Sequence, residues 1–216
     1  MTPVAEPPGT PISATLPTVP AALAIIRAEH RALRRLFEAM TALLTLARHG
    51  NREPDFNVLR AMLFYVDEFP ERLHHVKETK MLFARMRELS PTNCALLDRL
   101  DGEHAHGERR IRELEHKLSA WQFLGDARRA GFESSLAAYI AFYLEHMRVE
   151  EVELLPAAQL ALGEDDWRIL ARAFGLNRDA LAGAEPEAQY ATLFDTLLRA
   201  IGAAEAGGAE PRCKPG

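Results

Sequence analysis

Apolar residues recur at three- and four-residue steps along four long stretches of this chain, a spacing that predicts amphipathic helices. In the first stretch, for example, Leu23, Ile26, Leu33 and Phe37 fall on one face. We place the four helices at about residues 20–48, 53–88, 92–120 and 126–162. Because short breaks join them, we predict an all-α fold, an up-down-up-down four-helix bundle with short additional C-terminal helices.

Glycine, serine and proline mark the predicted helix ends. Gly50 follows the first helix and is its predicted C-cap. Ser90 is the predicted N-cap of the third helix, with Pro91 at the first helical position. Pro70 lies inside the second helix, where we expect a kink because proline lacks a backbone N–H.

The rest of the chain divides into two tails and an extension. We predict a disordered, Pro-rich tail at residues 1–19, the bundle at residues 20–162, a C-terminal helical extension at residues 163–203 and a disordered tail at residues 204–216. Two short amphipathic segments, at about residues 165–174 and 186–201, make up the extension. We expect them to cap one end of the bundle or to pack along its outside.

Seven polar residues interrupt the apolar faces of the long helices. Three helices carry the same His-x-x-x-Glu pattern, and a fourth carries one histidine. The residues are His74 and Glu78, His104 and Glu108, His146 and Glu150, and His30. Positions i and i+4 lie about 40° apart around a helix and about 6 Å apart along it, so each pair directs a nitrogen and an oxygen the same way. Four packed helices would gather these side chains into a cage suited to two neighbouring metal ions.

A purely structural explanation competes with this one. A single histidine on an apolar face is more often a structural residue, and one His-x-x-x-Glu pair can be a simple i,i+4 contact. Three glutamates facing one core are costly unless they are paired or bind a cation. Lys and Arg do not occupy these faces in matching numbers, so we favour the metal site.

Neighbouring histidines and glutamates are expected to point elsewhere. His75 follows His74 and is rotated about 100° from it, so it should face away from the site. Glu151 and Glu153 should lie towards the rim or the solvent, and His106 should be exposed.

The composition limits the setting and the partners. The chain is 48% apolar and 26% charged, with a net charge of −5, which gives no global attraction to nucleic acid or anionic lipid. No apolar run reaches the roughly 18–20 residues of a membrane-spanning helix, and the N-terminus lacks the features of a signal peptide. Two distant cysteines, Cys94 and Cys213, fit a reducing compartment. We expect a cytoplasmic monomer or homodimer that binds small molecules, with no nucleic acid or membrane partner.

The donor types also bear on the metal. Imidazole and carboxylate suit iron, manganese or zinc, whereas a structural zinc site would favour cysteine. Two six-coordinate ions offer about twelve positions, of which four histidines, two bridging glutamates and an oxo or hydroxo bridge would fill about ten. The third glutamate would fill one or two more. The site would then keep one open position, as binding of O₂, NO or peroxide requires, or none.

The order and spacing of these residues resemble the hemerythrin-like (HHE cation-binding) domain over about residues 20–160. The local context is similar as well: Phe69-Pro70 before His74-His75, the segment from Glu103 to Gly107, and Glu150-Glu151 before Leu154-Leu155-Pro156. The stretch containing Trp167, Phe174 and Asn177 resembles extensions of bacterial members. The resemblance implies a bacterial protein with two iron ions, for which manganese or zinc are possible substitutes, and with O₂, peroxide or NO as small ligands.

The chain departs from the oxygen-carrying hemerythrins at two ligand positions. Those proteins present a second histidine where this chain has Glu108, and an aspartate where it has Glu150. The added carboxylate favours the ferric state, so the resemblance implies the non-carrier branch, with oxidation chemistry, peroxide or NO handling, or iron sensing. The cysteine pair that marks the iron–sulfur-repair branch near its N-terminus is missing.

Tyr143 is a candidate for a role around the metal ligands. It lies three residues before His146 and seven before Glu150, so it should project over the metal face. Its hydroxyl could bond a backbone carbonyl in the core, or donate to a ligand carboxylate or to bound peroxide. Three functions stay open at this point: a weak peroxide- or NO-consuming enzyme, an iron or gas sensor without turnover, and a structural metal bundle.

Overall fold

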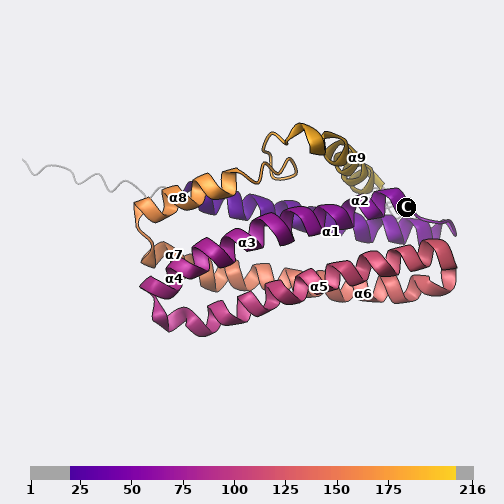
Figure 1. Ribbon diagram of the computed structural model, residues 1–216. Coiled ribbons are helices and arrows are strands. Elements are labelled where there is room, and N and C mark those ends of the chain that lie inside the picture. The colour runs from indigo at the N-terminus through magenta and orange to yellow at the C-terminus, as the bar shows by residue number, and fades with distance from the viewer. Residues whose placement is uncertain (1–19, 208–216) are drawn as a thin grey trace, which may run out of the picture.

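Four helical rods lie side by side in the computed structural model, which describes residues 20–207 (Figure 1). The first rod is α1 (Ala21–His49). The second contains α2 (Phe56–Val66), α3 (His75–Lys77) and α4 (Ala84–Leu89), joined by the π-helical segments Asp67–His74 and Glu78–Phe83. The third is a 3-10 turn (Pro91–Asn93) followed by α5 (Cys94–Leu124). The fourth contains a 3-10 turn (Asp126–Arg128), α6 (Arg129–Val149), the π-helical segment Glu150–Leu154 and α7 (Leu155–Ala161).

The extension forms α8 (Glu164–Gly175), a 3-10 turn (Ala188–Tyr190) and α9 (Ala191–Gly207). Helix α8 packs against α1, and α9 packs against α1 and α2, so the extension lies along the outside of the bundle (Figure 1). The all-α bundle is confirmed, and residues 20–207 contain no strand. Helix α9 continues to Gly207, beyond the predicted start of the second tail at residue 204. The tail predicted at residues 1–19, and the rest of the second tail, lie outside the described residues.

Local capping explains where the rods begin and end. The backbone N–H of Gly50 donates to the carbonyl of Leu46 and closes α1, as predicted. The Asp55 carboxylate accepts bonds from the backbone N–H groups of Asn57 and Val58, which starts the second rod. Ser90 stands at the N-cap position with Pro91 directly after it, as predicted, and its hydroxyl accepts a bond from the side-chain amide of Asn93.

The second rod passes through Pro70 without ending. Pro70 lies within the π-helical segment Asp67–His74, where the turn is wider than in an α-helix. A wide turn accommodates the missing N–H of proline, and it rotates consecutive side chains by less than an α-helical step. This geometry decides which histidines face inward, as described below.

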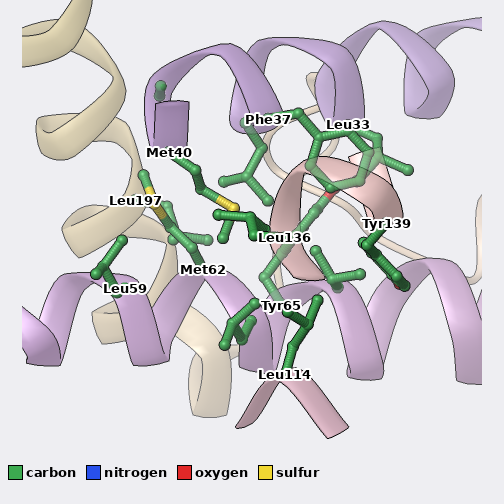
Figure 2. Close-up of a cluster of buried hydrophobic side chains, with 14 of the residues drawn as sticks. Leu33, Phe37, Met40, Leu59, Met62, Tyr65, Leu114, Leu136, Tyr139 and Leu197 are labelled. Atoms are coloured by element: carbon green, nitrogen blue, oxygen red, sulfur yellow. The ribbon is translucent and has the colours of Figure 1, made fainter. Parts of the chain in front are cut away.

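Two apolar clusters fill the bundle, one towards each end. The first cluster joins the second half of α1 with α2, α5, α6 and α9, and Figure 2 shows its centre around Leu33, Met40, Met62 and Leu136. The second cluster joins the start of α1 with Phe83, the start of α5, α7 and α8. On α1 the second cluster ends at Ile26 and the first begins at Leu33; on α5 the corresponding residues are Leu100 and Ile111. The interval between the two clusters is where the polar residues lie.

None of the helices within residues 20–207 combines the length and the hydropathy that crossing a lipid bilayer requires.

Candidate metal centre

Six of the seven predicted ligands meet in the polar interval between the two apolar clusters. Each of the six is at most 8% exposed, and together they come from all four rods. They are His30, His74, Glu78, His104, His146 and Glu150. The structure thus places one histidine of each rod, and two of the three paired glutamates, around one buried point.

Each of the two glutamates faces two different histidines. For Glu78, Oε1 lies 3.2 Å from Nε2 of His74 and Oε2 lies 3.5 Å from Nε2 of His104. For Glu150, Oε2 lies 3.3 Å from Nε2 of His30 and Oε1 lies 3.1 Å from Nε2 of His146. Each carboxylate therefore has one oxygen near His30 or His74 and the other oxygen near His104 or His146.

The carboxylate oxygens at this point lack hydrogen bonds. Both oxygens of Glu78, both oxygens of Glu150 and Nε2 of His74 are buried and have no hydrogen-bond partner among the described residues. Unsatisfied buried carboxylates are unfavourable unless a cation binds them. Together with imidazole nitrogens they form a donor set that suits first-row transition metals. The residues present therefore fit a metal centre.

The prediction that Glu108 is a ligand is wrong in this structure. Its side chain is 50% exposed and accepts a bond from Arg112 at 2.5 Å on the surface of the bundle. The inward face of α5 runs from Leu100 through His104 and Gly107 to Ile111, alternating steps of four and three residues. Glu108 lies one position beyond that face.

The expectation that His75 faces away is also wrong. His75 is 5% exposed, and its ring stacks on the His104 ring with a centroid distance of 4.1 Å. It forms a possible metal-holding group with Glu78, His104 and His146, while His30 and His74 form a second group with the same glutamate. The π-helical turns on either side of residues 75–77 allow both neighbouring histidines to face the interior. Burial, and then the charges of the nearby histidines, lower the pKa of His75 well below 6.5, which keeps its nitrogen lone pair free.

Carboxylates hold the outward nitrogen of most of these histidines. Nδ1 of His30 lies 2.9 Å from Glu151, and Nδ1 of His75 lies 3.1 Å from Glu71. Glu151 lies at the rim, as expected, with its side chain 28% exposed, and from there it contacts a histidine of the centre.

Two further carboxylates act from neighbouring rods. Nδ1 of His74 lies 2.6 Å from Glu29, and Nδ1 of His146 lies 2.8 Å from Glu103. Sequence analysis missed both, although each directly precedes a histidine of the centre in the chain. Such partners fix the tautomer, so that Nε2 carries the lone pair towards the metal position.

A hydroxyl completes the set. Nδ1 of His104 lies 3.0 Å from Oγ1 of Thr79, whose hydroxyl donates to Asp101 at 2.7 Å. Every histidine of the centre is thus oriented by a hydrogen bond on its Nδ1 side.

Tyr143 contacts the centre through a carboxylate that the sequence analysis did not single out. Its hydroxyl donates to Oε1 of Glu71, which also accepts from Tyr139 at 3.0 Å, while Oε2 of Glu71 faces His75. The partner of the Tyr143 hydroxyl is therefore neither a backbone carbonyl nor the carboxylate of Glu78 or Glu150. Burial raises the pKa of Glu71 to about 7, with the two tyrosine hydrogen bonds partly offsetting that rise.

Burial and charge shift the pKa values of the facing residues in opposite directions. Burial lowers the pKa of His146, but Glu150 and Glu103 outweigh it and raise that pKa to about 10. Burial and the charge of Glu78 raise the pKa of Glu150, but His146 and His104 outweigh them and lower it to about 2. Imidazolium protons therefore balance the carboxylates, and a bound metal ion would displace those protons.

The two sides of the centre differ in their surroundings. Beside His30 and His74 lies a cavity of ≈ 20 Å³, lined in part by Leu33, Phe69 and Met147, which is room for about one water-sized molecule. A groove of ≈ 250 Å³ also reaches the centre from the surface; it is lined in part by Thr79, His104 and Glu108, and His75 lines both the groove and the small cavity.

A buried cluster of imidazoles and carboxylates inside four packed helices defines a helical-bundle protein with an internal metal-binding site. The family model described as the hemerythrin HHE cation-binding domain matches residues 21–158. The chain therefore belongs to the hemerythrin HHE cation-binding family, and the resemblance drawn from its sequence is confirmed. Neither the curated proteins nor the solved structures contain a match to this chain.

Proposed function

We propose that this protein holds two iron ions at the centre and binds or reacts with O₂, peroxide or NO. The observation that carries the proposal is the arrangement of Glu78 and Glu150. Each is fully buried and lacks hydrogen bonds among the described residues. Each also directs one oxygen to His30 or His74 and the other to His104 or His146. Two carboxylates placed in this way suit a pair of ions that share them as bridges.

The number of donors supports an open position. Five imidazoles, including His75, and the four oxygens of the two glutamates make nine donor atoms, against the roughly twelve that two six-coordinate ions accept. Two of the imidazoles, His30 and His74, form one possible metal-holding group, and the other three form the second group. Both histidines of the first group line the small cavity. We therefore place the small ligand on the cavity side, next to His30 and His74.

The side chains would perform three tasks around such ions. The Nδ1 partners hold each imidazole so that Nε2 points inward. The two apolar clusters keep bulk water away from the ligand. Glu71, with a pKa of about 7, can hold or release a proton next to His75 near neutral pH. A bound iron pair would supply the redox chemistry that these side chains lack.

Metal analysis of three variants tests the ion pair. After iron-replete expression, the parent should contain about two iron ions per chain. Glu78→Ala and Glu150→Ala should lose most of this iron, because each removes a bridge. Glu108→Ala is the matched control and should keep the parental iron content. One ion per chain, mostly zinc, or equal losses in all three variants would overturn the proposed ion pair.

A second experiment tests the small ligand. Anaerobically reduced protein is mixed with O₂, hydrogen peroxide or NO, and its optical spectrum is followed with time. Spectral changes that depend on the ligand concentration support an open position, and repeated turnover separates an enzyme from a sensor. A spectrum that none of the three ligands changes would identify a closed, structural centre.

A further inference from the structure

The helical extension reaches the metal centre from outside the family domain. The family model ends at residue 158, whereas α8 and the loop after it bring three buried residues, Phe174, Asn177 and Asp179, towards the site. Asn177 and Asp179 line the small cavity together with His30 and His74. The wall of that cavity is thus shared between the bundle and the extension.

Asn177 is bonded to the carboxylate that holds His74. Its side-chain N–H donates to Oε1 of Glu29 at 2.8 Å, and the other oxygen of Glu29 lies 2.6 Å from Nδ1 of His74. The amide oxygen of Asn177 accepts a bond from Lys77 on the second rod. Asn177 is only 4% exposed, and its bond to Glu29 is buried, whereas Lys77 is partly exposed.

One ring–ring contact and one hydrogen bond fix the position of this loop. The Phe174 ring meets the His74 ring edge-on, with a centroid distance of 5.4 Å and an interplanar angle of 75°. Tyr65 of α2 donates to Asp179 at 2.7 Å. The chain on both sides of Asn177 is therefore attached to the bundle, which holds its amide at Glu29.

We infer that Asn177 is a positioning residue of the metal centre, which orients His74 through Glu29. The inference rests on the proposed function, because the orientation matters for a metal bound at Nε2. Without the amide, one oxygen of Glu29 would lack its buried partner, and the carboxylate could rotate away from His74. The imidazole would then lose the bond that fixes its tautomer, a change that typically costs about 10–100-fold in metal affinity.

The test compares Asn177→Ala with Leu176→Ala in the full-length protein. Leu176 precedes Asn177 and is 71% exposed, so its truncation controls for effects on the loop. Asn177→Asp keeps the size of the side chain and its bond to Lys77 but cannot donate to Glu29. It replaces Asn177→Ala if that variant does not fold.

Two measurements are made on each protein. In chelator-treated protein, the Nδ1–H proton of His74, which is bonded to Glu29, should exchange slowly with solvent by NMR in the parent and in Leu176→Ala, and faster in Asn177→Ala. After loading with iron(II), transfer to a chelator should be about 10–100-fold faster from Asn177→Ala than from the other two proteins.

The outcomes separate the two claims. If the parent binds no iron, the proposed function fails, and the exchange rate of the His74 Nδ1–H proton alone decides whether Asn177 orients His74. If the parent binds iron but Asn177→Ala matches Leu176→Ala in this exchange rate and in transfer rate, the positioning role is overturned while the ion pair stands.

Discussion

Two glycines of α5 allow a controlled test of the packing around Glu71. A Cβ added to Gly107 would lie 2.7 Å from the Tyr143 hydroxyl and 2.9 Å from Oε1 of Glu71. A Cβ added to Gly102, on the same helix, would meet no heavy atom of the described residues within 4 Å. Gly107→Ala and Gly102→Ala therefore make the same chemical change in crowded and in open surroundings.

The expected free energies have opposite signs. Replacing glycine by alanine inside a helix stabilises it by about 1 kcal/mol, and Gly102→Ala should show this gain alone. Gly107→Ala adds an overpacking cost of about 1–3 kcal/mol, since Tyr143 is fully buried and lies against His75 and Phe37. It also disturbs the Tyr143–Glu71 hydrogen bond, worth about 1.5–3 kcal/mol when the acceptor is charged. The net loss should be about 1.5–5 kcal/mol.

Thermal unfolding followed by circular dichroism measures both changes, with all proteins treated with the same chelator. For a domain of this size, about 1 kcal/mol moves Tm by about 2–4 °C. Gly102→Ala should therefore raise Tm by about 2–4 °C, and Gly107→Ala should lower it by about 3–20 °C. A rise in Tm for Gly107→Ala equal to that for Gly102→Ala would refute the argument that Glu71 and Tyr143 cannot move.

Three more predictions concern the charged centre. In chelator-treated protein, the free energy of unfolding should be highest near pH 4.5–6.5. His146 stabilises the fold fully below its ordinary pKa of 6.5 and loses this effect as pH rises through its folded-state pKa of about 10. Glu150 stabilises the fold above its ordinary pKa of 4.5 and loses this effect as pH falls towards its folded-state pKa of about 2. Denaturant titrations that show no decline in the free energy of unfolding on either side of this pH range would contradict this. Tyr143→Phe should keep the iron content and change the rate of oxidation by O₂ or peroxide by about 10-fold or more, and superimposable stopped-flow traces would leave the hydroxyl with only a packing role. Glu151→Gln should speed iron(II) release by about 10-fold, because it weakens the partner of His30; release at the parental rate would assign Glu151 to the surface.

The fold and most of the centre were predictable because they depend on helical periodicity. Apolar residues at steps of three and four define the rods, and a histidine within an apolar face must point inward. The failure at Glu108 has a specific cause. Along α5 the inward positions alternate steps of four and three, so the residue after His104 on that face is Gly107. A rule based on i+4 spacing alone places the Glu108 carboxylate inside the bundle. When steps of four and three alternate, Glu108 instead falls beside the inward face of α5.

The remaining features depend on geometry that one sequence does not display. Both His74 and His75 face inward because π-helical segments adjoin them, and the α-helical step used for the prediction does not apply there. Glu29 and Glu103 act on histidines of other helices, at separations of 45 and 43 residues. Such contacts follow from how the rods pack, so no local pattern predicts them.

The two apolar clusters have a consequence for how an ion arrives. Each joins residues of all four rods, so apolar packing that needs no metal ion holds the bundle together on both sides of the centre. Small zinc modules differ, because they fold only around their ion. Here the site is enclosed before an ion reaches it, and uptake must pass through the groove beside His104 or through a transient opening between helices. The rate of uptake should therefore be set by the protein's own motion, rise steeply with temperature, and level off as the metal concentration increases.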